Sequence, residues 1–102
     1  MDWSSLSNTA IVQEIGKRLK GYRLRKKYTQ QDLATQAGVS VFSIAQIERG
    51  KSVSLSVLLP VLRALKLLDN LELLLPKTGV SPVELLKLQG KTPQRIRPKK
   101  LK

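Results

Sequence analysis

The sequence contains no cysteine and no histidine, and only a Trp, a Phe and two Tyr represent the aromatic residues. These absences exclude a thiol nucleophile, a disulfide framework, a zinc finger and a histidine that acts as base or metal ligand. Any catalysis would depend on Asp and Glu, which form no clustered pair along the chain. We therefore expect no enzyme, no metal site and no cofactor.

Acidic residues are also scarce. The chain has 7 Asp and Glu against 19 Lys and Arg, and its formal net charge is +12. Such an excess predicts a polyanionic partner, with nucleic acid as the first candidate and an anionic membrane surface as the second. The aromatic residues are not arranged as a base-stacking platform, which argues against a sequence-indifferent binder of DNA or RNA.

Long apolar runs are missing as well. The first ten residues, MDWSSLSNTA, lack the basic and apolar regions of a secretory signal. The leucine-rich stretch near residues 55–75 is interrupted by Arg63, Lys66, Asp69 and Glu72. No transmembrane helix fits there, so we expect no membrane insertion and a cytoplasmic protein.

The most informative segment is residues 29–50, TQQDLATQAGVSVFSIAQIERG. Thr29 and Asp32 have the spacing of a capping box, and Gly38 stands where a helix would end in the left-handed conformation. Ser40 can cap a second helix that Gly50 would stop. Two short helices joined by a tight turn predict a helix-turn-helix, which places its second helix in the major groove of DNA.

The second of these helices has two different faces at 100° per residue. Ile44 and Ile47 point to one side, where they would enter the core. Phe42, Gln46 and Arg49 point to the opposite side, together with Ala45. We therefore expect Phe42 to be exposed, although a contact within the fold is the alternative.

An earlier helix is predicted from Asn8 or Thr9 to about Lys26, and its second half is strongly basic. Some of its cations are expected to contact phosphate, although a solvated face with cations at the helix C-terminus is the alternative. Its apolar stripe consists of Ile11, Ile15, Leu19 and Tyr22.

Two more helices are predicted after the helix-turn-helix. One covers residues 54–66. If Ser56 caps it, Pro60 falls near the first turn at little cost, whereas a start at Ser54 places the proline inside the helix and predicts a kink. A short fifth helix runs from Asp69 or Asn70 to Leu75. The apolar stripe of the fourth helix is Leu58, Leu59, Leu62 and Leu65.

These elements predict an all-α protein with one small domain over residues 9–76. Residues 1–8 form an N-terminal arm, in which Trp3 would pack against the domain or a dimer partner. Residues 77–90 form a linker and a short helix at 82–88, opened by the capping box of Ser81 and Glu84. Residues 91–102 form a basic tail that we expect to be disordered when free.

Residues 15–75 resemble the XRE/Cro/cI family of bacterial and phage repressor domains. The likeness rests on TQ at the start of the second helix, LAxxAGVS through the turn, SIxxIExG in the third helix and the leucine-rich fourth helix. The resemblance implies a compact five-helix, lambda-repressor-like fold. It also implies binding to a double-stranded DNA operator as a homodimer.

Site residues follow from this resemblance position by position. Arg23 and Glu48 would form a partly buried ion pair, and Gln30 would contact a phosphate while bracing the recognition helix. The resemblance puts Ser40, Val41, Phe42 and Gln46 at base edges. It puts Ser43, Arg49 and Lys51 beside the sugar-phosphate backbone, and the basic helix adds Lys17 and Lys27 as candidate phosphate contacts.

The sequence departs from the phage repressors at two reading positions. Val41 and Phe42 stand where those proteins often carry glutamine. An apolar side chain can contact a thymine methyl group but cannot form a bidentate hydrogen bond. We therefore expect hydrogen-bonded readout from Gln46, with methyl contacts and shape readout for the rest.

The segment SPVELLKLQGK and the basic stretch after it resemble small HipB-like regulators, which are encoded beside HipA-type kinase toxins. The leading hypothesis is a repressor on a pseudo-palindromic operator, with its own operon in a bacterium or phage as the expected target. An antitoxin or scaffold subunit that binds a toxin is the second hypothesis, and the two are compatible. A sequence-indifferent nucleic-acid binder is the third.

Overall fold

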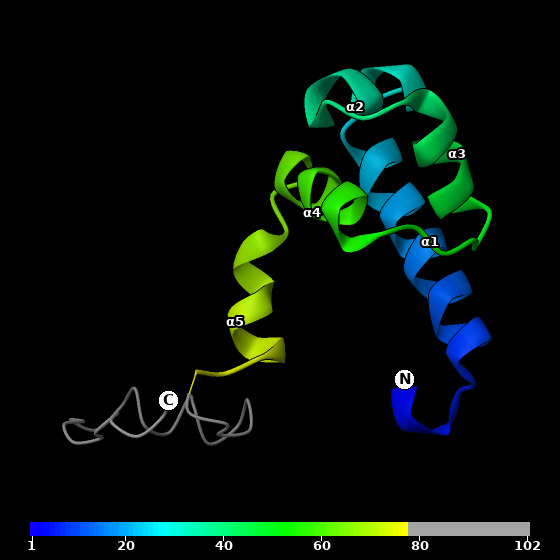
Figure 1. The fold of residues 1–102 in the computed structure, drawn as a ribbon, viewed down its shortest axis with the longest axis vertical. Helices are drawn as coiled ribbons and strands as arrows, with labels where there is room; N and C mark the ends of the chain where they lie inside the picture. Colours follow the sequence, from blue (N-terminus) through cyan, green and yellow to red (C-terminus); the bar gives the residue numbers. More distant parts are fainter. Residues whose placement is uncertain (78–102) are drawn as a thin grey trace, which may run out of the picture. The chain divides into compact units, whose positions relative to one another are not determined.

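The computed structural model describes residues 1–77, and the chain divides into a compact unit of Met1–Lys66 and a second unit that begins at Leu67. Within residues 1–77 every regular element is helical and no strand occurs. This confirms the all-α fold class and the five predicted α-helices. Figure 1 shows their order along the chain.

The first unit holds four α-helices, of which α3 packs against α1 and α2, and α2 packs against α4. Its core consists of seven apolar side chains, each at most 5% exposed. These are Leu19, Leu33, Ala34, Ile44, Ile47, Val61 and Leu65. The elements are a 3-10 turn at Trp3–Ser5, α1 at Asn8–Arg25, α2 at Gln30–Ala37, α3 at Val41–Glu48 and α4 at Leu55–Ala64.

The ends of α2 and α3 form as the sequence predicts. The Thr29 hydroxyl accepts a hydrogen bond from the Asp32 amide, and the Asp32 carboxylate accepts one from the Thr29 amide, each at 2.9 Å. Gly38 ends α2 with φ of 72°, a conformation that glycine adopts without steric cost. The Ser40 hydroxyl then caps α3 by accepting from the Ser43 amide at 3.0 Å. These local bonds fix the turn between the two helices.

The buried face of α1 differs from the predicted stripe. Ile15 and Tyr22 are exposed at 37% and 36%, and Ile11 is only half-buried. Gly16, Leu19 and Arg23 are buried instead. Leu19 is therefore buried as predicted, but the prediction was wrong for Ile15 and Tyr22, because the side of α1 that meets α3 is set by a backbone approach and an ion pair, described below.

The fourth helix begins at the earlier of the two predicted caps. Ser54 is the N-cap of α4, so Pro60 lies inside the helix, where it cannot donate a hydrogen bond to the carbonyl of Ser56. Val61 is buried at 1% exposure, whereas the predicted stripe residue Leu59 is 37% exposed. The leucine pattern thus predicted the helix correctly but predicted part of its buried face wrongly.

The described part of the second unit contains a 3-10 turn at Leu68–Asn70 followed by α5 at Leu71–Leu74. This agrees with a short helix that ends at about Leu75. The predicted helix at 82–88 and the basic tail at 91–102 lie outside the described residues. Within the described residues, no helix has both the length and the apolar composition needed to cross a bilayer.

The N-terminal arm turns back onto α1. The guanidinium of Arg18 lies over the Trp3 ring, 4.7 Å from its centroid, and also donates to Glu14 at 2.8 Å. This confirms the prediction that Trp3 packs locally. The hydrogen bond from Arg18 lowers the pKa of Glu14 below its ordinary value.

Candidate nucleic-acid interface

The predicted recognition helix, α3, is fixed to the domain through one face. Ile44 and Ile47 are 1% and 5% exposed and anchor that face in the core. On the opposite side Val41 is 41% exposed and Phe42 is 66% exposed. The fold does not use the Phe42 ring as a core residue, which confirms the predicted exposure.

Beyond Phe42, the outward face of α3 carries polar groups. Gln46 is half-buried and Arg49, the C-cap of the helix, is exposed. An Nη2 hydrogen of Arg49 is donated to Oε1 of Gln46. The face therefore combines an aromatic ring with a joined amide and guanidinium, all on the side turned away from the core.

Ser40 and Ser43 are largely engaged within the helix end. Besides the capping bond, their hydroxyl oxygens lie 3.0 Å apart, so one donates to the other. Ser40 was predicted at a base edge and Ser43 at the backbone. The structure places both at the start of α3, where much of their hydrogen-bonding capacity serves the cap.

A buried network joins α1, α2 and α3 behind this face. Arg23 donates to both carboxylate oxygens of Glu48, at 2.6 and 3.0 Å, and to the carbonyl of Tyr28 at 2.7 Å. Gln30 donates to the same carboxylate at 3.0 Å. The side chains of Arg23 and Glu48 are 8% and 5% exposed. The network ties the end of α3 to the two helices beside it.

The network also defines what Gln30 can offer to a ligand. One hydrogen of its amide nitrogen is donated to Glu48, and the second hydrogen is available to an acceptor such as a phosphate oxygen. The predicted double role of Gln30, bracing α3 and binding phosphate, is therefore chemically consistent with its position.

The backbones of α1 and α3 meet at Gly16. A Cβ atom added at this glycine would lie 2.1 Å from the carbonyl oxygen of Ile47, far closer than any real contact. Only glycine allows this approach. The approach fixes the position of α3 along α1, and this position brings Arg23 beside Glu48.

Most cations of the first unit have no acidic partner within it. Between Met1 and Lys66 the sequence has eleven Lys and Arg but four Asp and Glu. Only Arg18 and Arg23 form ion pairs among the described residues. Those left without a carboxylate there include the exposed Lys17, Lys27, Arg49 and Lys51.

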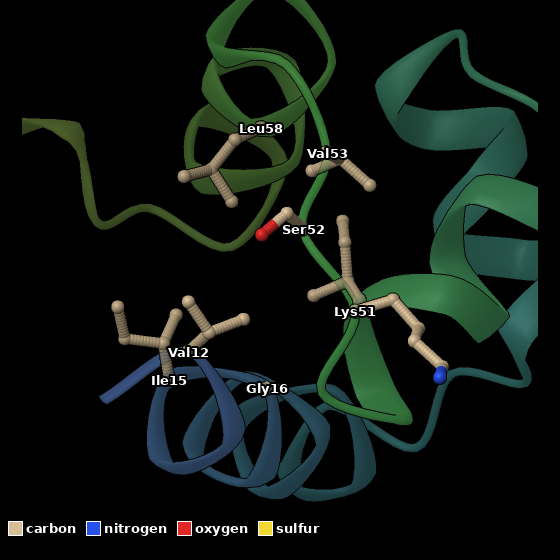
Figure 2. Close-up of a pocket in the computed structure, with 8 residues that line it drawn as sticks. Val12, Ile15, Gly16, Lys51, Ser52, Val53 and Leu58 are labelled. Atoms are coloured by element: carbon tan, nitrogen blue, oxygen red, sulfur yellow. The ribbon is translucent and has the colours of Figure 1, made fainter. Parts of the chain in front are cut away.

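One pocket lies on the domain, lined by α1, α4 and the connection between α3 and α4. Figure 2 shows Val12, Ile15, Val53 and Leu58 around it, with the Lys51 nitrogen turned away from the isoleucine and valine of α1. Its volume is about 110 Å³, well below the roughly 300 Å³ at which ligand pockets begin. Its walls are mostly apolar, and its small size argues against a ligand site.

Two features of the interface were absent from the sequence-based prediction. The contact at Gly16 had a signal, because a glycine inside a long helix often marks a close approach. The pair of Gln46 and Arg49 also had a signal in the sequence, since residues three apart on a helix are neighbours. Both signals are weak without a structure to show the partner.

These helices, their turn and the outward face of α3 define a helix-turn-helix protein. The helix-turn-helix family model matches residues 19–69, which is half of the chain. The chain belongs to the XRE-type helix-turn-helix family and is a DNA-binding transcription regulator. The comparison with curated proteins gave no match.

Proposed function

We propose that this regulator represses transcription by binding a pseudo-palindromic operator as a homodimer. The observation that carries the proposal is the exposed outward face of α3, where Phe42 is 66% exposed while the opposite face is buried. The fold leaves this ring and the polar side chains beside it open to a partner. In this fold class the partner of α3 is the major groove.

The charge distribution supports the same partner. Phosphate contacts by cations release condensed counterions, and each neutralised phosphate steepens the fall of log K with log salt by about 0.9. Lys17, Lys27 and Lys51 are exposed without a carboxylate partner among the described residues. They, with Gln30, Ser43 and Arg49, are the proposed phosphate contacts.

A dimer would place two copies of α3 in successive major grooves, about 34 Å apart. Repression would follow when the dimer covers a promoter. The promoter proposed is that of its own operon, in the cytoplasm of a bacterium or a phage-infected cell. The activity proposed is binding, without catalysis.

The test is a fluorescence-anisotropy titration at about 150 mM salt, with the duplex upstream of the protein's own gene and a scrambled duplex of equal composition. We expect a preference of about a thousandfold or more for the upstream duplex. Equal affinity for both would replace the proposal with sequence-indifferent binding. Footprinting then measures the spacing of the half-sites and so tests the dimer.

Gln46→Ala sharpens this test. It should lower affinity by about 1–3 kcal/mol and relax preference at one base pair per half-site. Lys17→Ala is the control, because it removes an exposed cation of α1 and should weaken binding to every duplex alike. An equal loss on both duplexes for Gln46→Ala would remove this residue from the base-reading set.

The second candidate function is that of an antitoxin, which the likeness of residues 81–91 to HipB-like regulators favours. Coexpression with a HipA-type kinase encoded beside the gene, followed by purification, would test it. A stoichiometric complex supports this role, and its absence argues against it. The repressor proposal does not depend on the result.

A further inference from the structure

The pair formed by Gln46 and Arg49 bears on which base α3 reads. Both residues belong to the outward face, and the two are joined by the hydrogen bond from the Arg49 guanidinium to the Gln46 amide oxygen. Arg49 has no acceptor atom, so only the oxygen end of the amide can face it. The amide nitrogen with its two hydrogens is therefore the end left for a ligand.

A glutamine without such a neighbour matches adenine. Its oxygen accepts from the adenine N6 amino group while its nitrogen donates to N7. In this protein the oxygen already accepts from a cation, and the remaining N–H groups of that cation lie beside it. An adenine amino group would approach a surface that consists of donors and carries a positive charge.

Guanine presents the opposite pattern, because both N7 and O6 are acceptors in the major groove. The free N–H groups of Gln46 and Arg49 can only donate hydrogen bonds, so they match the two acceptors of guanine. We propose that Arg49 is a positioning residue that turns Gln46 from a reader of adenine into a reader of guanine. This inference rests on the proposed binding of operator DNA through α3.

Lys51 supplies the matched control. It is an exposed cation two residues beyond Arg49, and its side-chain nitrogen points away from Val12 and Ile15 of α1 (Figure 2). Its backbone amide donates to the Gln46 carbonyl, a bond that a change of side chain preserves. Arg49→Met and Lys51→Met each remove one cation, but only the first removes the partner of the amide.

The experiment selects bound duplexes from a randomised DNA library with the wild-type protein and the two variants, and sequences them. We expect the wild type to select guanine at one position of each half-site. Arg49→Met should shift that position from guanine toward adenine by about tenfold, the size of one good base contact. Lys51→Met should weaken binding while leaving all preferences unchanged.

Two results would overturn the inference, and they are distinguishable. If Arg49→Met weakens binding as Lys51→Met does and leaves the base preference unchanged, Arg49 acts only as a phosphate contact and does not orient Gln46, while the repressor proposal stands. If the wild type selects no sequence at all, the repressor proposal itself fails and this inference fails with it.

A measurement without DNA tests the pair directly. The side-chain amide signals of Gln46 in a ¹H–¹⁵N spectrum should move in Arg49→Met and stay in place in Lys51→Met. Circular dichroism would show that both variants are folded, as expected for changes at exposed positions. Unmoved Gln46 signals in Arg49→Met would mean that the amide is not held by Arg49, which overturns the inference.

Discussion

The two faces of α3 differ in the contacts that their side chains make within the domain. On the inward face, Ile44 and Ile47 are buried and Glu48 accepts hydrogen bonds from Arg23 and Gln30. On the outward face, Phe42 is 66% exposed, and within residues 1–77 the side chains of Gln46 and Arg49 hydrogen-bond only to each other. One face completes the domain, and the other is left for a partner.

This contrast teaches how one short helix and the residue that caps its end serve stability and recognition at once. Substitutions on the inward face should be measured mainly as lost free energy of unfolding. Substitutions on the outward face should be measured mainly as lost DNA affinity. Four predictions test the division, from the largest expected loss of stability to the smallest.

Glu48→Ala should lower the free energy of unfolding by about 3–5 kcal/mol, because it leaves Arg23 buried without its charge partner. Urea unfolding followed by circular dichroism measures the loss. Glu14→Ala is the control, since it breaks the exposed pair with Arg18 and should change stability far less. Equal losses in the two variants would mean that burial of the Glu48 pair does not matter.

Gly16→Ala should lower the free energy of unfolding by about 1–3 kcal/mol, since the new methyl group cannot fit against the Ile47 carbonyl. Gly21→Ala lies on the same helix with no other atom within 4 Å of the added Cβ. It should stabilise the protein by about 0.5–1 kcal/mol. Thermal melts of both variants test the close approach, and a stabilised Gly16→Ala would disprove it.

Ser40→Ala should lower the free energy of unfolding by about 1 kcal/mol, because it removes the cap of α3. The same variant measured on DNA sharpens the comparison, since Ser40 was also predicted at a base edge. If stability is unchanged and base preference relaxes, Ser40 acts as a reading residue and the capping bond is dispensable.

Phe42→Ala should change the free energy of unfolding by no more than about 0.5 kcal/mol, as expected for an exposed side chain. DNA affinity should fall, because the ring is the largest apolar group that α3 offers to a thymine methyl. Urea unfolding measures the change in stability, and an anisotropy titration of the same protein sample measures the change in DNA affinity. A large loss of stability would place Phe42 in a contact of the fold.

The sequence by itself determined the features that depend on residues close along the chain. The capping box of Thr29 and Asp32, the turn at Gly38 and the cap at Ser40 need no distant partner, because each is closed by hydrogen bonds over a few residues. The burial of Ile44 and Ile47 opposite Phe42 followed from helical periodicity alone. Arg23 and Glu48 came from a family resemblance, since nothing local links residues that far apart.

The tertiary structure alone decided which side of each longer helix is buried. The contact of Gly16 with Ile47 turns Arg23 inward and leaves Ile15 exposed, although Ile15 is the more apolar residue. On α4, Val61 is buried in place of Leu59. Hydrophobicity favours burial of Val61 and Leu59 about equally, and it favours burial of Ile15 over that of Arg23. Which side chains are buried depends on how closely the neighbouring backbones can approach. The sequence of one helix alone does not determine that distance.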